Sequence, residues 1–306
     1  MERNENRHFR QNMLALLGAM IWGTAIVAQS VAAQHMSPFT FNTLRASIAV
    51  VFLLGVCVLQ GLYRRWKGTA VPRSRRDLIL GGLSCGTVLT LAGWFQQRGI
   101  QTTLPGKAGF LTSLYIILVP LVGIPLGKKV PGSLWIGMPL AVAGMYFLCV
   151  TEELTIASGD IYLCLCALCF TAHILVVDYF TEKVDGVELS CAQFFVMAVL
   201  SLGGAMTETP PSLEALPIYL GPVLYVGVFS SGVGYTLQIL AQRGSNPAVV
   251  SLIMSMESVF AVLGGALLLG NRMTGREYLG CGLMLVAVVL AQLPSSPRKR
   301  NEAAKT

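Results

Sequence analysis

The residue of this 306-residue chain with the clearest capacity for chemistry is Glu257, a carboxylate inside a long apolar run. It follows Pro247 by ten residues, which at about 1.5 Å per helical residue is roughly 15 Å into a bilayer core about 30 Å thick. An ionisable group at that depth is costly, so Glu257 is a candidate for binding a substrate or accepting a proton. A structural carboxylate, protonated or bonded to another helix, is the competing interpretation.

Two basic residues and a histidine are the other ionisable candidates within the apolar runs. Arg45 lies near the start of the run 38–60 and suits an anionic group, although its side chain can equally snorkel to the interface. Lys107 opens the run 106–126, where an interfacial position competes with a binding role. His173 lies in the run 160–179, and packing is the competing interpretation for a single membrane histidine.

Polar and aromatic side chains within the runs are further candidates, because hydrogen-bonding groups and flat apolar faces both line ligand cavities. Most aromatic residues in such runs belong to the packed interior. With the four residues above, the candidate substrate and coupling residues are Trp22, Asn42, Trp94, Gln97, Tyr115, Gln193, Tyr235 and Gln238.

The chain lacks the sequence patterns of common catalytic and cofactor sites. It contains no Walker loop, no GxGxxG after a strand, no HExxH and no nucleophile elbow. All eight cysteines lie in apolar runs, and the pair Cys166 and Cys169 has no second pair or suitably spaced histidines to complete a zinc site. We therefore expect no enzyme activity, no metal and no cofactor.

Ten apolar runs, each near the length that crosses a bilayer, occupy almost the whole chain. The chain is 54% hydrophobic and 12% charged, whereas a soluble domain is about 25% charged. We predict an all-α polytopic membrane protein with ten transmembrane helices. The runs are 12–33, 38–60, 78–97, 106–126, 132–150, 160–179, 188–206, 216–240, 246–269 and 275–293.

The basic residues gather in the gaps between runs, which argues against nucleic acid as a partner and sets the topology. With the N-terminus in the cytoplasm, 17 of the 22 Lys and Arg residues fall on the cytoplasmic side. We predict a multi-pass protein of the cell (cytoplasmic) membrane with both termini in the cytoplasm. The stretch 61–77 is interpreted as a basic loop that anchors this side, and the first run as an uncleaved span rather than a signal peptide.

The sequence contains an internal repeat. LGKKVPGSLWIG at Leu126–Gly137 returns 143 residues later as LGNRMTGREYLG at Leu269–Gly280. Further echoes pair Gln97-Arg98-Gly99 with Gln242-Arg243-Gly244, and, at an offset of 148, Trp22 with Phe170 and Arg45 with Gln193.

When a unit with an odd number of spans is repeated in tandem, its two copies enter the membrane in opposite directions. We therefore predict two inverted five-helix repeats, residues 1–150 with helices 1–5 and residues 151–306 with helices 6–10 and a basic cytoplasmic tail. Transporters of this design bind substrate near the midplane, between the repeats. At the offset of 143 the counterpart of Glu257 is Leu114, so the carboxylate occurs in one copy.

Local signals predict where helices start and where they approach each other. Ser37-Pro38 and Asn246-Pro247 each place a capping residue before a proline at the first helical position. Gly82 and Gly86, like Gly123 and Gly127, are spaced to put small residues on one helix face, where another helix can pack closely.

The sequence resembles the EamA-type permeases of the drug/metabolite transporter superfamily, which have ten helices from duplicated five-helix units. Where these permeases have Leu-Glu-Pro-Val, this chain has Met256–Val259 without the proline, and the helix is expected to be straighter for it. Asn271 stands where the permeases have Glu. The resemblance rests on Trp22-Gly23-Thr24, Pro38–Asn42 with Arg45, Gly106–Phe110, Gly159-Asp160, Asp178, Gln193, Met256–Val259 and Leu267–Gly270.

The resemblance implies a secondary transporter that exports amino acids or related small metabolites. The inverted repeat predicts alternating access around a midplane cavity, with protons as candidate coupling ions at Glu257. The expected partners are a small-molecule substrate and the lipid bilayer, and a homodimer is compatible with the sequence. Two alternatives stay open: an uncoupled channel-like or lipid-moving protein, and a membrane-embedded lipid enzyme, for which no interfacial cluster of His, Asp and Ser is evident.

Overall fold

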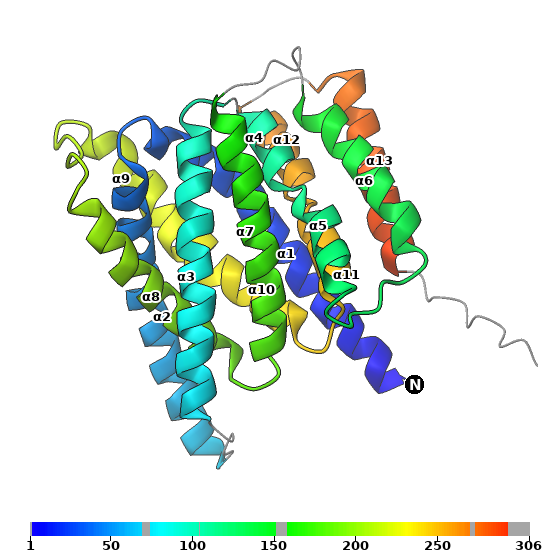
Figure 1. Cartoon of the computed structure of the whole chain (residues 1–306), viewed down its shortest axis with the longest axis horizontal. Coiled ribbons are helices and arrows are strands. Elements are labelled where there is room, and N and C mark those ends of the chain that lie inside the picture. The colour runs from blue at the N-terminus through cyan, green and yellow to red at the C-terminus, as the bar shows by residue number, and fades with distance from the viewer. Residues whose placement is uncertain (1, 69–73, 104, 151–157, 270–272, 293–306) are drawn as a thin grey trace, which may run out of the picture.

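In the computed structural model the chain is a bundle of helices standing side by side (Figure 1). The structure describes residues 2–68, 74–103, 105–150, 158–269 and 273–292, and no β-strand occurs in these ranges. The predicted C-terminal tail and Asn271 lie outside the described residues. The helices are α1 (Glu2–Ala33), α2 (Pro38–Lys67), α3 (Arg75–Ile100), α4 (Pro105–Thr112), α5 (Tyr115–Gly123), α6 (Leu134–Cys149), α7 (Ser158–Phe180), α8 (Gly186–Ala205), α9 (Leu216–Tyr225), the π-helix η1 (Val226–Gly234), α10 (Tyr235–Gln242), α11 (Pro247–Met254), α12 (Glu257–Leu269) and α13 (Gly275–Gln292).

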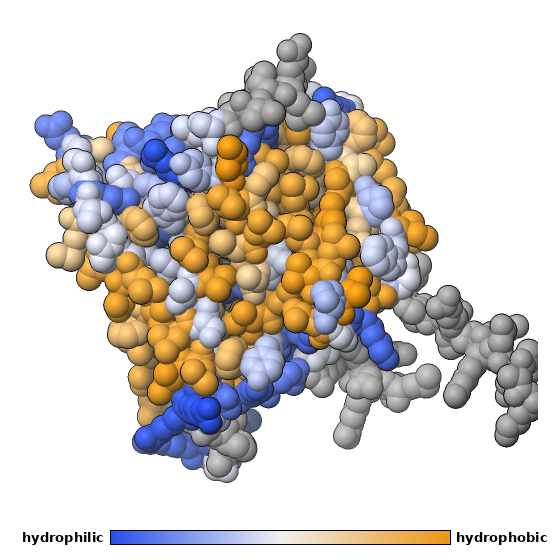
Figure 2. Space-filling model, in the orientation of Figure 1, coloured by the Kyte–Doolittle hydropathy of each residue, from blue (hydrophilic) through white to orange (hydrophobic). Residues whose placement is uncertain are grey.

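Every predicted apolar run coincides with a helix or with consecutive helical pieces. Within the described residues, eight stretches are long and apolar enough to cross a membrane, and the shorter apolar stretches are Lys107–Gly123 and Leu134–Cys149. Figure 2 shows a hydrophobic band across the visible face, with hydrophilic residues toward its upper and lower ends. The protein is therefore an all-helical, multi-pass membrane protein, and the count of ten transmembrane helices stays a prediction.

The two halves of the chain run in opposite directions. α1 rises from the lower edge of Figure 1, where the N-terminus is marked, whereas α7 descends from the upper edge. The first helix of each half packs along the broken fourth span of the other half. Gly23 of α1 lies against the backbone of Glu257 and Ala261 on α12, and the ring of Phe170 on α7 lies 6.5 Å from that of Tyr115 on α5. This crosswise packing is what the inverted repeat predicts.

The fourth span of each half breaks at the same place. α4 and α11 begin at Pro105 and Pro247, which are 142 residues apart, and each ends after eight residues. The next two residues form a tight turn with 3₁₀-type bonds. The Leu114 N–H donates to Leu111 O at 3.3 Å, and the Met256 N–H donates to Ile253 O at 3.1 Å. α5 and α12 then begin directly after the turn.

These breaks correct two predictions. The ninth span is not straight without its proline, because the 3₁₀ turn at 255–256 interrupts the helix without one. The counterpart of Glu257 is Tyr115 rather than Leu114, because each is the first residue of the helix after the break. The predicted equivalence was displaced by one residue, since it used the offset of a loop segment beyond the break.

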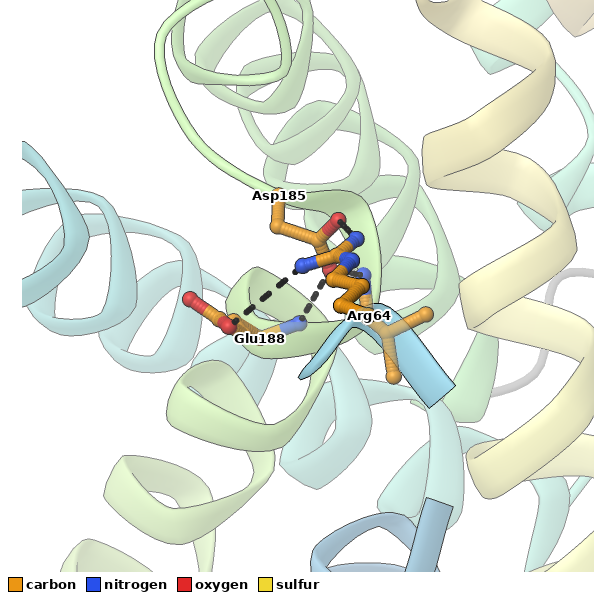
Figure 3. Close-up of polar contacts among 4 residues, drawn as sticks. Arg64, Asp185 and Glu188 are labelled. Carbon is orange, nitrogen blue, oxygen red and sulfur yellow. Dashed lines mark hydrogen bonds and ion pairs between the residues drawn. The ribbon is translucent and has the colours of Figure 1, made fainter. Parts of the chain in front are cut away.

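α2 and α8, the second helices of the two halves, are joined at both ends by carboxylates. At one end Glu208, which follows α8, accepts the backbone N–H groups of Phe39 at 3.0 Å and Thr40 at 2.8 Å. At the other end Arg64 of α2 donates to Asp185 at 2.6 Å and lies 4.0 Å from Glu188 (Figure 3). Because a carboxylate at a helix N-terminus complements the helix dipole, each contact also stabilises a helix end.

We expect Arg64→Ala to lower thermal stability through loss of this ion pair. The two side chains are mostly buried, with exposures of 19% and 10%, so the cost is about 1–2 kcal/mol and the melting temperature falls by a few degrees. A thermal-unfolding assay in detergent measures the change. Arg65→Ala, at the exposed neighbouring residue, is the control, and an equal shift for both variants contradicts a role for the ion pair.

Three local predictions on helix ends and packing also need correction. Ser37 occupies the N-cap position of α2 without a side-chain bond, because Glu208 takes those N–H groups. Much of the predicted loop 61–77 is helical, since α2 continues to Lys67 and α3 begins at Arg75. Gly127 lies in a turn at φ 80° rather than on a packing face.

The other predictions of this kind are confirmed. Asn246 accepts the N–H of Ala248 at 3.0 Å and so caps α11. On α3, Gly82 and Gly86 lie against Ala192 and Val196 of α8, where added Cβ atoms would come within 2.7 Å and 2.6 Å of those side chains. The small residues therefore allow α3 and α8 to pack closely, as the spacing predicted.

Candidate functional site

The candidate site is a narrow cavity between the two halves. It is bounded by both breaks and extends toward the end at which α1 and α3 finish. The centres of water-sized molecules can occupy about 50 Å³ of it, which is room for a few waters. Its lining residues are Trp22, Ile26, Gln29, Arg45, Gln96, Ile100, Ala108, Gly109, Thr112, Tyr115, Phe170, Ile174, Ser230, Tyr235, Gln238, Met254 and Glu257.

At the other end of the bundle, polar contacts between helices close off the cavity. The side chain of Gln242 donates to Ile174 O at 2.9 Å. Lys128, after α5, forms an ion pair with Asp178 near the end of α7. The Asn246 amide donates to Lys129 O at 2.5 Å. The cavity therefore extends toward one end of the bundle, and polar contacts between helices lie between it and the other end.

The lining of the cavity includes one basic and one acidic residue. Arg45 from α2 and Glu257 from α12 bring opposite charges to the same space, and neither forms an ion pair with another side chain in the described part of the chain. Both are buried. Two separately predicted candidates, one from each half, thus line the same cavity.

The helix break positions Glu257. As the first residue of α12, it places a carboxylate at a helix N-terminus, which the helix dipole favours. Ser113, in the turn of the other break, donates its hydroxyl to Glu257 Oε1 at 3.3 Å. Tyr115, the counterpart in the first half, lines the same cavity. The two breaks therefore meet at the cavity with different side chains.

Aromatic rings form the apolar walls. The rings of Trp22 and Tyr235 lie 4.8 Å apart, and Phe170 and Tyr115 face the same space. The Trp22 indole donates to Ser230 O at 3.2 Å. Ser230 belongs to η1, whose π-type turns differ from the α-helical bonding of its neighbours. The carbonyl thereby fixes the orientation of the Trp22 ring.

Other predicted site residues lie behind the cavity wall or away from it. Asn42 and Gln97 are fully buried but are not among the lining residues. His173 bonds to Gln193 at 3.0 Å and packs its ring 5.9 Å from that of Tyr235, so this pair supports a wall residue instead of facing the cavity.

The last two predicted residues belong to other contacts. The Trp94 ring packs against the rings of Phe39, with centroids 5.8 Å apart, and Tyr162, with centroids 5.9 Å apart. Lys107 forms an ion pair with Asp160 of α7. Asp160 and Lys107 both carried part of the family resemblance. In the structure they form one ion pair that joins α4 to α7.

Sequence reasoning also missed lining residues. Gln96, Thr112 and Met254 reach the cavity, and nothing in their local sequence distinguishes them from packing residues. Phe170 had a signal, because it is the repeat counterpart of Trp22 and faces the same space.

Comparison with known proteins establishes the family. The family model for EamA-like transporters matches residues 10–150 and again 157–293. The chain belongs to the EamA-like transporter family. The two matched segments correspond to the two halves seen in the structure. Membership in this family indicates that this EamA-like protein is a membrane transporter.

Relatives of this EamA-like transporter carry the same general description. An uncharacterized transporter of Archaeoglobus fulgidus is 31% identical over 281 residues, covering 92% of this chain and 84% of the relative. An uncharacterized transporter of Bacillus subtilis is 24% identical over 296 residues, covering 95% and 96%. A solved crystal structure at 16% identity matches with a TM-score of 0.76 over 93% of this chain and 97% of that chain, which supports the fold alone.

Proposed function

We propose that this EamA-like transporter is a secondary transporter that exports a small organic metabolite, such as an amino acid or related compound, by alternating access. The observation that carries the proposal is the cavity between two inverted halves, in which Arg45 and Glu257 supply opposite charges. A zwitterion presents both charges at once, so its charged groups match those of the walls. The family points to transport instead of enzyme activity.

The geometry of the helices supports alternating access. Inverted repeats exchange two equivalent arrangements when one bundle rocks against the other. The two breaks lie at equivalent positions beside the cavity, where a tight turn can change angle without loss of helix packing elsewhere. With the termini in the cytoplasm, as the charge distribution predicts, the present arrangement extends toward the outside and is closed toward the cytoplasm.

The size of the cavity favours a carrier over an open channel. The space available to the centres of water-sized molecules is about 50 Å³, which accommodates a few waters. A metabolite therefore requires a wider arrangement of the helices, and polar contacts close one end of the cavity.

We further propose that Glu257 takes up the proton that couples transport. The cell membrane as location and a homodimer as assembly stay predictions.

A counterflow assay tests the carrier directly. The purified protein is reconstituted into vesicles loaded with an unlabelled amino-acid mixture, and a labelled mixture is added outside. A carrier accumulates label transiently above the equilibrium level, because unlabelled substrate drives the exchange. Entry that rises only to equilibrium and does not saturate supports a channel. Absence of flux for amino acids and related zwitterions contradicts the proposed substrate class.

We expect Gly109→Leu to block the cavity without disturbing the fold. Gly109 lines the cavity on α4, and no atom lies within 4 Å of an added Cβ. Leucine also favours a helix by about 1 kcal/mol over glycine. Counterflow should fall at least about tenfold, or 1.4 kcal/mol, with the melting temperature unchanged or raised. Gly55→Leu, on exposed surface of α2 with similar space, is the control, and normal flux in Gly109→Leu contradicts this cavity as the route.

A further inference from the structure

The junction of α2, α3 and α8, directly behind the cavity wall, contains polar atoms without partners. Both amide atoms of Asn42 and Gln97 are buried and lack a hydrogen-bond partner within the described residues, as do Nε and Nη2 of Arg45. Arg45 also lines the cavity, so its side chain connects this junction with the open space. Buried polar groups are nearly always bonded, so such a cluster requires an explanation.

In the second half each equivalent side chain has at least one hydrogen-bond partner, although Gln193 Nε2 and Gln242 Oε1 have none within the described residues. Gln193, the counterpart of Arg45, bonds to His173 at 3.0 Å. Gln242, the counterpart of Gln97, donates to Ile174 O at 2.9 Å. At the offset that pairs Arg45 with Gln193, Asn42 corresponds to Ser190, whose hydroxyl accepts from Thr236 at 2.8 Å. The fold therefore needs no cation at this position, and the arginine of the first half calls for a different partner.

The surroundings of Arg45 are those of an anion site. Its guanidinium carbon lies 5.5 Å from the centroid of the Phe41 ring. This ring carries no negative charge that could neutralise the guanidinium. Gly93 of α3 lies directly against it, since an added Cβ would be 2.5 Å from Nη2 and 3.1 Å from Asn42 Oδ1. A guanidinium binds a planar two-oxygen group through parallel N–H bonds, and the Asn42 amide lies beside it.

We propose that Arg45, held by Phe41 and Gly93 and flanked by Asn42, is the binding site for one carboxylate group, which enters from the cavity. The Arg45 guanidinium donates to the carboxylate oxygens as the ligand draws it toward the cavity, and the free Asn42 amide completes the polar shell. The assignment of that carboxylate to the transported molecule rests on the proposed function. A free small carboxylate ion has the same chemistry.

Thermal unfolding of the purified protein in sodium acetate or sodium chloride, at equal ionic strength and neutral pH, tests the site without transport. Binding to the folded state raises the melting temperature, so acetate should raise it by several degrees and chloride should not. Arg45→Gln copies the second half. It should lose the acetate response and, without acetate, melt at the same or a higher temperature, because it removes an uncompensated buried charge.

The controls separate ligand binding from a structural role. Arg98→Gln, the same change at an exposed arginine, should respond to acetate as the unmodified protein does. Arg45→Lys keeps the charge but loses the planar pair of donors. Its affinity for acetate, read from how the melting temperature depends on acetate concentration, should therefore fall about tenfold or more. A lower melting temperature for Arg45→Gln without acetate, or an acetate response that survives in it, overturns the proposal, as does equal stabilisation by chloride.

Vesicle transport distinguishes the two sources of the carboxylate. If the group belongs to the transported molecule, acetate raises the apparent KM without changing the maximal rate. If it belongs to a separate ion, acetate raises the maximal rate, and Arg45→Gln is insensitive to it. Either result supports the site. A protein that transports none of the tested compounds but shows the acetate shift in unfolding contradicts the proposed function and leaves the carboxylate site supported.

Discussion

Replacing Glu257 by glutamine should abolish proton-driven transport and lower the rate at least about tenfold, or 1.4 kcal/mol of activation free energy. The amide is nearly the same size and keeps a partner for the Ser113 hydroxyl, which lies 3.3 Å from Oε1. It neither carries charge nor exchanges a proton, so the flux should also lose its dependence on pH. Vesicles with an imposed pH gradient, in which substrate uptake and proton flux are both measured, check this result.

Counterflow in the same variant separates the two roles of the carboxylate. If Glu257 only couples protons, exchange without a gradient persists in Glu257→Gln. If it also binds a cationic group of the substrate, exchange falls as well. Glu182→Gln, at an exposed residue beyond the end of α7, is the matched control and should behave like the unmodified protein. Unchanged substrate movement and unchanged pH dependence in Glu257→Gln would refute both roles.

Gly23→Ala should destabilise the protein severely. An added Cβ on Gly23 would lie 2.5 Å from Glu257 O and 2.8 Å from Ala261 N, and these backbone atoms cannot move without shifting α12. Overpacking of this kind costs about 1–3 kcal/mol, and separation of α1 from α12 also moves Glu257 in the cavity. We expect a drop of many degrees in melting temperature or loss of folded protein, measured by size-exclusion chromatography of heated samples.

A second glycine at the same helix interface provides the control. Gly264 of α12 faces Thr24 of α1, and an added Cβ would make an ordinary contact of 3.6 Å. Gly264→Ala should therefore leave the protein folded and slightly more stable, since alanine favours a helix by about 1 kcal/mol. Similar drops in melting temperature for both variants would show that the interface tolerates no added methyl group. Such a result would contradict the prediction that Gly23 is the specific point of close contact.

The positions of the spans were predictable because they depend on local composition. Each apolar run coincides with helix, and the repeat in the sequence anticipated that the halves cross. Which helices touch was not predictable from the sequence. The sequence made Lys107 a candidate for binding substrate, but in the structure it contacts Asp160, which lies 53 residues later in the chain. The same holds for Trp94, whose neighbours Phe39 and Tyr162 come from two other helices.

Irregular helix geometry also escaped prediction. The breaks at 113–114 and 255–256 contain no glycine or proline, the residues that usually signal an interruption, and depend on the helices packed around them. Likewise, η1 has no distinctive sequence pattern beyond its small residues, although it sets Trp22 through Ser230. Arg45 and Glu257 were found because charge at membrane depth is itself a signal, whereas Gln96 and Met254 carry none.

The crosswise packing of α1 on α12 and of α7 on α5 has a consequence for ancestry. The first helix of each half covers the broken span of the other half, so a gene for a single copy would yield a chain whose broken span lacks that cover. Such a chain becomes complete only when it meets a second copy inserted upside down, which requires one sequence to enter the membrane in both orientations. Joining two copies in one gene removes that requirement and frees each to specialise. The carboxylate at one break and the phenol at the other are what that freedom allows.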